Sequence, residues 1–214
     1  MTTKLIIGNK NYSTWSLRPW LLLSAFDLPF DEVNESLQPD RLRARLLTHS
    51  PAGKVPVLVD ADVLVWDSLA ICEYVSEVHL AGQGWPRNAP DRAKARAICC
   101  EMHAGFTALR AALPMNIRAK RKVDLSAACR ADIARIDAIW SDHRPDNWLF
   151  DTFGIADCFY APVALRFETY GIELSPAARA YQVKLLAHPA VQRWTEAALS
   201  ETDVVAADEA GLEI

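Results

Sequence analysis

The 214-residue chain lacks the features that define several large classes of protein. It has no run of eighteen apolar residues, so we expect no membrane span. Its N-terminus has neither the apolar core nor the cleavage site of a signal peptide, which favours the cytoplasm. Its net charge is −4, so nothing indicates a nucleic-acid surface, and we interpret the basic run at 118–122 as a solvated helix end.

Cysteine and histidine are sparse and show no metal-ligand pattern. The five cysteines are an odd number without a Cys-x-x-Cys motif, which argues against disulfides and fits a reducing compartment. They lie in helix-like apolar segments, so we expect buried structural thiols, with a catalytic cysteine as the alternative. The histidine spacing predicts no zinc or other metal site. The residues are Cys72, Cys99, Cys100, Cys129, Cys158, His49, His79, His103, His143 and His188.

The first part of the chain alternates strand and helix patterns. With 51% hydrophobic and 23% charged residues, the sequence suits a globular protein of one or two domains. We predict strands at 4–8, 31–36 and, as a pair, within 55–66. Helices are expected at 16–27, 40–48 and 67–79, with Ser16 as the N-cap of the first. The order βαβαββα over residues 1–80 is typical of the thioredoxin-like fold.

The second part is predicted to be all helical. Residues 81–90 contain two glycines and two prolines and are expected to form a linker. Within 91–214 we predict helices at 91–112, 125–143, 155–170, 176–187 and 189–200, with Pro114 ending or kinking the first. Gly154 and Asp157 suit the start of the third, where the Asp157 carboxylate has a structural role. The acidic tail from Glu201 is either a loose arm or folds back over the domain.

Three short motifs carry a resemblance. The segment 55–60 is a short strand with a Val-Pro start, and Asp67-Ser68 follows the next strand at the beginning of a helix. Upstream, residues 13–18 read Ser-Thr-Trp-Ser-Leu-Arg, and residues 50–56 form a Ser-Pro-Ala-Gly-Lys-Val-Pro loop. Together these motifs resemble the cytosolic glutathione transferase family of the serine-using type. The first is most similar to the zeta class, although Trp15 stands where that class has cysteine.

The resemblance implies how the chain would activate glutathione. Only about 3% of a thiol with pKa roughly 8.5 is thiolate at pH 7, and the thiolate is the nucleophile. Lowering the pKa by ~2 units requires about 2.7 kcal/mol. A hydroxyl donor to the sulfur supplies part of this, and the start of the first helix supplies more. Ser13 is the first choice of donor and Thr14 the second; the alternative is that both merely cap the helix.

The same resemblance implies a glutathione site. Ser68 would bind the γ-glutamyl carboxylate and Asp67 its ammonium, a role that can coexist with helix capping. Val55 would pair its backbone with the cysteinyl part of glutathione, beside a cis Pro56. Lys54 would approach a carboxylate of glutathione or remain solvated.

The electrophile pocket is expected between the two domains, where pockets commonly form. Candidates to line it lie beside the first motif and near the predicted break at Pro114. For the first two the alternative is core packing, and for Arg118 a surface position. The candidates are Tyr12, Trp15, Met115, Asn116 and Arg118.

These motifs predict a glutathione transferase that conjugates glutathione to a small apolar electrophile, with glutathione as co-substrate and no metal. One alternative is a zeta-like isomerase of maleyl-type dicarboxylates, against which Trp15 counts. The other is a non-catalytic module that uses the same fold to bind a protein. Since family members are usually dimers, the resemblance also implies a homodimer.

Overall fold

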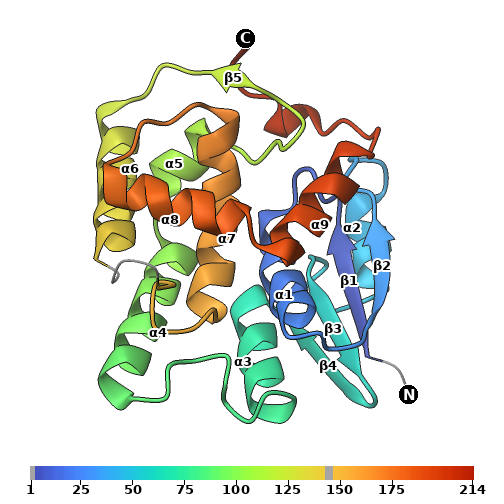
Figure 1. Cartoon of the computed structure of the whole chain (residues 1–214). Helices are drawn as coiled ribbons and strands as arrows, with labels where there is room; N and C mark the ends of the chain where they lie inside the picture. The colour runs from blue at the N-terminus through green and yellow to red at the C-terminus, as the bar shows by residue number, and fades with distance from the viewer. Residues whose placement is uncertain (1–2, 143–146) are drawn as a thin grey trace.

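The computed structural model describes residues 3–142 and 147–214. Its first part is an α/β unit in which helices pack beside a small mixed sheet (Figure 1). The elements follow the predicted order βαβαββα. They are β1 (Lys4–Gly8), α1 (Thr14–Ala25), β2 (Asp31–Glu35), α2 (Leu42–Leu47), β3 (Val57–Asp60), β4 (Val63–Trp66) and α3 (Ser68–Val78).

The sheet has the strand order β2-β1-β3-β4. β1 pairs with β2 in parallel, with Leu5 opposite Glu32, and with β3 antiparallel, with Leu5 opposite Leu58. β3 and β4 form an antiparallel hairpin. β1 is central because its residues after Lys4 are buried apolar ones or glycine. The thioredoxin-like prediction is therefore confirmed for this part of the chain.

The second part is helical, as predicted, and is built around α7. This helix is buried along almost its whole length and packs against α1, α4 and α8. One apolar core runs through both parts and includes Leu17 of α1 and Phe159 of α7. The elements are α4 (Ala89–Ala104), α5 (Thr107–Ala112), β5 (Arg121–Lys122), α6 (Ala127–Ser141), α7 (Ile155–Thr169), α8 (Pro176–Leu186), α9 (Pro189–Leu199), the 3₁₀ turn η1 (Ala206–Asp208) and β6 (Leu212–Glu213).

Two element predictions require correction. The helix expected at 91–112 is two helices, because the chain turns at Gly105 and at Phe106, whose φ is +57°. A Cβ at Gly105 would lie 2.7 Å from the Glu101 carbonyl oxygen, so only glycine fits there. The first helix begins at Thr14 rather than Ser16, since the Ser13 carbonyl already accepts from Leu17 N–H at 3.2 Å.

Asp157 has the expected structural role. One carboxylate oxygen accepts from Gly154 N–H at 3.0 Å, and the other accepts from Leu149 N–H and the Tyr181 hydroxyl. Burial raises the Asp157 pKa to about 6 despite these donors. The group therefore holds the start of α7 against the preceding loop and against α8.

The C-terminal segment returns to the first unit, which decides between the two options for the tail (Figure 1). Trp194 of α9 donates its indole N–H to the Lys10 carbonyl at 2.9 Å. The Glu201 carboxylate then accepts from the backbone N–H groups of Lys10 and Asn11 at 2.7 and 3.0 Å. Further along, β6 pairs with β5. The tail therefore folds back and holds the loop between β1 and α1.

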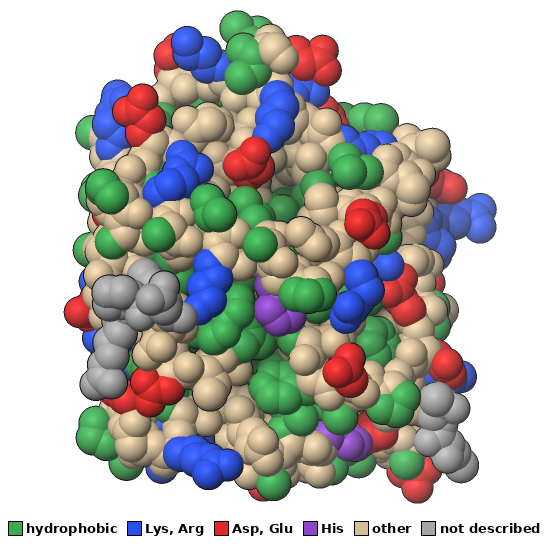
Figure 2. Space-filling model, in the orientation of Figure 1, with side chains coloured by type: hydrophobic (Ala, Val, Ile, Leu, Met, Phe, Trp, Pro, Cys, Tyr) green, Lys and Arg blue, Asp and Glu red, His purple; other side chains and the backbone are tan. Residues whose placement is uncertain are grey.

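The boundaries 80 and 91 stay a prediction for the division into domains. The described helix α6 ends at Ser141, whereas the predicted end and His143 lie outside the described residues. In the part of the chain that is described, no helix is long and apolar enough to span a bilayer. Figure 2 shows basic and acidic side chains interspersed over one face, without a broad patch of either sign.

Candidate functional site

A cleft with two compartments opens at the starts of α1 and α3. The first, called here the Asp67 cavity, has a volume of about 440 Å³ and is lined by Pro56, Trp66, Asp67, Ser68 and His103 among others. The second, the Ser13 cavity, has about 470 Å³ and is lined by Tyr12, Ser13, Thr14, Arg166 and Asp208 among others. Trp15, Lys54 and Val55 line both, so the two cavities share a wall. This cleft brings together every residue predicted to bind or activate glutathione.

The start of α3 presents hydrogen-bond donors to the Asp67 cavity. Asp67 is the N-cap, and its Oδ1 accepts from Leu69 and Ala70 N–H at 2.9 and 3.4 Å. The buried Ser68 accepts at Oγ from an Arg18 Nη1 donor at 3.3 Å. Its own hydroxyl proton and its backbone N–H have no acceptor among residues 3–142 and 147–214. Two donors and the positive end of the helix thus remain available for a carboxylate.

His103 closes the Asp67 cavity from the helical part of the chain. Its Nε2 lies 3.2 Å from Asp67 Oδ2, and its ring meets Trp15 edge-on at a centroid distance of 5.1 Å. Burial lowers the His103 pKa more than the Asp67 carboxylate raises it, so the neutral imidazole is favoured. Asp67 therefore combines helix capping with a contact to α4.

Arg18 places a buried positive charge behind Ser68. Its side chain is 1% exposed, and its guanidinium carbon lies 4.2 Å from the Trp15 ring centroid and 4.4 Å from that of Phe159. Its Nε has no hydrogen-bond partner, and no described carboxylate forms an ion pair with it. Burial lowers the Arg18 pKa to about 9. Such a charge favours an anion in the adjacent cavity.

Two hydroxyl groups lie at the start of α1, as predicted. Ser13 Oγ donates to Ser16 Oγ at 2.7 Å, and Ser16 Oγ also accepts from Gly8 N–H at 3.1 Å. Ser13 is the N-cap, but its side chain does not cap the helix. The Thr14 hydroxyl has no partner in the described part of the chain, nor do the backbone N–H groups of Trp15 and Ser16. The structure thus brings both candidate donors to one cavity without choosing between them.

The loop before β3 forms the shared wall. The Val55–Pro56 peptide bond is cis, as predicted. The ladder between β1 and β3 begins at Val57, so Val55 is outside the sheet. Over the described ranges, Val55 makes no backbone hydrogen bond, and Lys54 beside it makes no ion pair. Both residues are therefore placed to contact a peptide-like ligand in the cleft.

The five candidates for the electrophile pocket separate into two groups. Tyr12 and Trp15 line the Ser13 cavity. Met115, Asn116 and Arg118 do not line either compartment. Met115 is buried in the core, and the Asn116 amide bonds to Asn11 and Glu209. Arg118 donates to the Tyr12 hydroxyl and to carbonyls of the tail, so it ties the tail to the helical part.

Two further arginines border the Ser13 cavity or its wall. The Arg110 guanidinium carbon lies 4.9 Å from the Trp15 ring centroid, on a side chain that donates to the Met102 and Gly105 carbonyls. Arg166 donates through Nη1 to the Leu113 carbonyl and, at 3.4 Å, to the Arg110 carbonyl. Burial lowers the pKa of both groups, that of Arg166 to about 10. Arg166 therefore lines the Ser13 cavity itself, whereas Arg110 lies behind its Trp15 wall.

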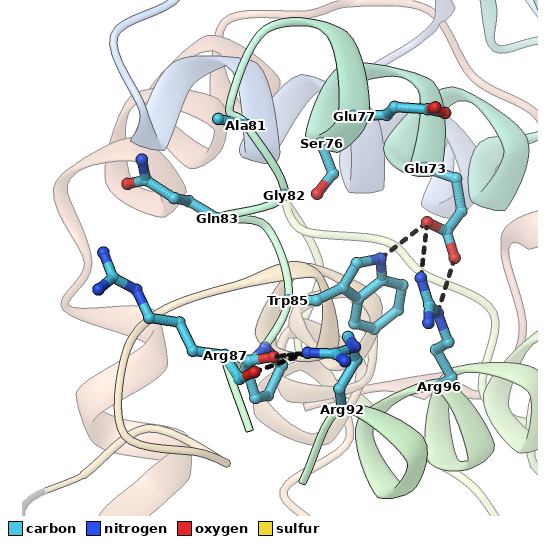
Figure 3. A pocket seen from close by; sticks show the side chains of 11 residues that line it. Glu73, Ser76, Glu77, Ala81, Gly82, Gln83, Trp85, Arg87, Arg92 and Arg96 are labelled. Atoms are coloured by element: carbon cyan, nitrogen blue, oxygen red, sulfur yellow. Dashed lines mark hydrogen bonds and ion pairs between the residues drawn. The ribbon is translucent and has the colours of Figure 1, made fainter. Parts of the chain in front are cut away.

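A larger cavity, of about 740 Å³, lies between α3 and the start of α4 (Figure 3). Two of its charged side chains pair with each other: Glu73 accepts from Arg96 at 3.1 Å and also from the Trp85 indole at 2.8 Å. Arg92 donates to the carbonyls of Pro86 and Arg87. No group of three or more His, Cys, Asp or Glu that could hold a metal occurs within the described ranges. The residues predicted to bind or activate glutathione line the Asp67 and Ser13 cavities and not this one.

Sequence reasoning missed Arg18, His103 and Arg166. A signal was available for Arg18, the single charge in an otherwise apolar helix, whereas α7 contains Asp157 and Glu168 besides Arg166. Such residues are buried only when the fold gives them partners or a function. His103 had no comparable signal, since its contact with Asp67 depends on how α4 packs beside α3.

Comparisons with known proteins agree with this geometry. The family model described as glutathione S-transferase, N-terminal domain, matches residues 12–78, and the corresponding C-terminal domain matches residues 118–197. The chain is 24% identical to a probable maleylacetoacetate isomerase of Caenorhabditis elegans over 168 residues, 76% of this chain and 78% of the relative. It is 26% identical to glutathione S-transferase GstB of Escherichia coli over 205 residues, 89% and 90% of the two chains.

Solved structures share the fold. A glutathione transferase homologue from Burkholderia, with bound glutathione, has a TM-score of 0.73 and 21% identity. The match covers 92% of this chain and 98% of that one.

Proposed function

We propose that this chain, which belongs to the glutathione S-transferase family, binds glutathione in the two-compartment cleft and transfers its thiolate to an electrophile. The observation that supports this most is the meeting of three features in one cleft. The free donors of Ser68, the unpaired backbone of Val55 and the hydroxyls of Ser13 and Thr14 all face it.

The γ-glutamyl end of glutathione fits the Asp67 cavity. Its carboxylate would accept from the Ser68 hydroxyl and N–H at the positive end of α3, with the buried Arg18 charge behind. The Asp67 carboxylate, which is partly exposed, would attract the ammonium group. The cysteinyl backbone would pair with Val55, as a strand adds to a free edge. Lys54 would approach the glycyl carboxylate.

The thiol would then lie near the start of α1. In the free protein the Ser13 hydroxyl donates to Ser16, so it must turn toward the sulfur. Turning gives up a neutral hydrogen bond worth roughly 0.5–1.5 kcal/mol and forms one to a charged group worth roughly 1.5–3 kcal/mol. Ser16 keeps its Gly8 donor. The exchange is favourable only when the sulfur is ionised, which is the condition for lowering its pKa.

A zeta-like isomerase is the second candidate, supported by the similarity to a probable maleylacetoacetate isomerase. Trp15 weighs against it, since its indole ring, which contacts Arg18 and Arg110, cannot supply the thiol of the zeta motif. The non-catalytic module is the third, and it requires no affinity for glutathione. The homodimer and the cytoplasmic location remain predictions.

Calorimetric titration with glutathione tests the proposal, followed by a panel of electrophiles with glutathione as the second substrate. We expect saturable binding with one glutathione per chain and release of the leaving group with at least one electrophile. Absence of glutathione binding by a folded protein would reject the proposal and favour the protein-binding module.

A further inference from the structure

The Ser13 cavity contains an arginine whose charge is only partly compensated. Arg166 is 7% exposed, lines the cavity and uses Nη1 for two backbone carbonyls. Its Nε and Nη2 have no acceptor in the described ranges, and no described carboxylate oxygen lies within ion-pair distance. A buried guanidinium that lines a cavity and has unused donors is suited to a planar anion.

The surrounding charges reinforce this preference. Arg110 lies beside Arg166, since the Arg110 carbonyl accepts from the Arg166 guanidinium, and the guanidinium carbons of Arg18 and Arg110 lie 4.2 and 4.9 Å from the Trp15 ring centroid. None of the three has a carboxylate partner among the residues described. Three like charges in a region of low dielectric repel one another, so a bound anion relieves this repulsion.

One carboxylate, that of Asp208 in the C-terminal tail, acts electrostatically on Arg166. Asp208 lines the same cavity, and its negative charge stabilises the protonated Arg166 guanidinium although the two side chains form no ion pair. Burial raises the Asp208 pKa, which shows that its surroundings are not fully adapted to its own charge. Asp208 thus supplies part of the missing negative charge and would repel a second carboxylate.

We propose that the electrophile bound in the Ser13 cavity carries a carboxylate, which Arg166 recognises through its free Nε and Nη2 donors. This rests on the proposed function, because the thiolate must be delivered to the same cavity. It replaces the small apolar electrophile that the sequence favours with an anionic one. Arg166 is a specificity residue, and Ser13 and Thr14 remain the candidates for activating the thiol.

Two glutathione conjugates of equal shape test this without requiring turnover. S-(4-carboxybenzyl)glutathione carries the carboxylate, and S-(4-carbamoylbenzyl)glutathione carries a neutral amide in its place. We expect calorimetry to give the carboxylate conjugate about ten- to a hundredfold tighter binding, the range for a hydrogen bond to a charged group. The ratio of the two dissociation constants is the measured quantity, so a general loss of affinity cancels.

Variants with opposite expected effects make the test specific. Arg166→Met should reduce the preference for the carboxylate to near unity, whereas Asp208→Asn should increase it several-fold by removing a competing charge. Arg135→Met is the control, because Arg135 is a half-exposed arginine on α6 that pairs with Glu101 at the surface. It removes the same charge from the protein and should leave the ratio unchanged.

Each outcome decides between the two proposals. If plain glutathione does not bind, the proposed function fails and this inference fails with it. If glutathione binds but the carboxylate conjugate is not preferred, or Arg166→Met keeps the preference, only this inference is wrong. If Arg166→Met does not fold, Asp208→Asn decides, and an unchanged or reduced preference in that variant overturns the inference.

Discussion

Replacing Ser13 by alanine tests the hydroxyl that we assign to the sulfur. The change removes the donor to Ser16 in the free protein and the proposed donor to the thiolate in the complex. The net stabilisation is the difference between a charged hydrogen bond and the neutral one given up, roughly 1–2 kcal/mol. Since 1.36 kcal/mol corresponds to one pKa unit, Ser13→Ala should raise the pKa of bound glutathione by about one unit.

The sign of this effect determines the assay. A raised thiol pKa lowers the thiolate fraction at pH 7, by about threefold if the pKa of bound glutathione rises from ~6.5 to ~7.5. Ultraviolet absorbance of the thiolate, followed against pH in the saturated complex, reports the pKa directly. Glutathione affinity at low pH should stay within a few-fold, because the thiol is protonated there and needs no donor.

Ser16→Ala and Thr14→Val are the matched controls. Ser16→Ala removes the acceptor that holds the Ser13 hydroxyl in the free protein, so it should not raise the thiol pKa. Thr14→Val should do less than Ser13→Ala. If Thr14→Val shifts the titration and Ser13→Ala does not, the free Thr14 hydroxyl is the donor. If neither shifts it, the free N–H groups at the start of α1 stabilise the sulfur instead.

Three further predictions concern binding and stability. Ser68→Ala should weaken glutathione binding by roughly 1 kcal/mol or more, the scale of a hydrogen bond to a charged group. An unchanged affinity in calorimetry would show that Ser68 does not contact glutathione. Because burial raises the Asp157 pKa to about 6, its carboxyl stabilises the fold below the unfolded pKa of about 4, and this contribution is lost as pH rises through about 6. Urea unfolding of Asp157→Asn should therefore be less dependent on pH from 4 to 7 than wild type, and equal slopes would contradict the raised pKa. Glu201→Ala leaves the N–H groups of Lys10 and Asn11 without an acceptor and should lower the free energy of unfolding by roughly 1–3 kcal/mol. Glu201→Gln should lower it less, and an equal loss in both variants would refute this reasoning.

Local patterns in the sequence were sufficient for the first unit. The apolar run at 4–8, the Val-Pro start before β3 and the Asp-Ser start of α3 each lie where the structure has them. These signals are local, because a buried strand needs a run of apolar residues and a helix start needs a capping group. The break between α4 and α5 was missed, since it depends on the close approach of Gly105 to the Glu101 carbonyl rather than on periodicity.

The electrostatics of the cleft could not be predicted in the same way. Arg18, Arg110 and Arg166 come from three helices, α1, α5 and α7, that are distant in the sequence, and only the tertiary fold brings Arg18 and Arg110 to Trp15 and Arg166 to the backbone of Arg110. No spacing rule predicts such a cluster. A single charge in an apolar helix indicates that something unusual is buried, but not which residues will surround it.

The geometry of the thiol site is in turn set by the whole chain. The loop from β1 to α1 is held by Glu201, which binds the Lys10 and Asn11 N–H groups, and by Glu209, which accepts from the Tyr12 hydroxyl. These contacts join residues about 190 positions apart. The first motif therefore supplies the hydroxyl groups, whereas the C-terminal segment fixes the backbone from which they project. This division of roles explains why the motif indicates the chemistry but leaves the choice between two adjacent hydroxyl groups to experiment. A rotation about the backbone of a single residue would exchange which of the two hydroxyl groups reaches the sulfur.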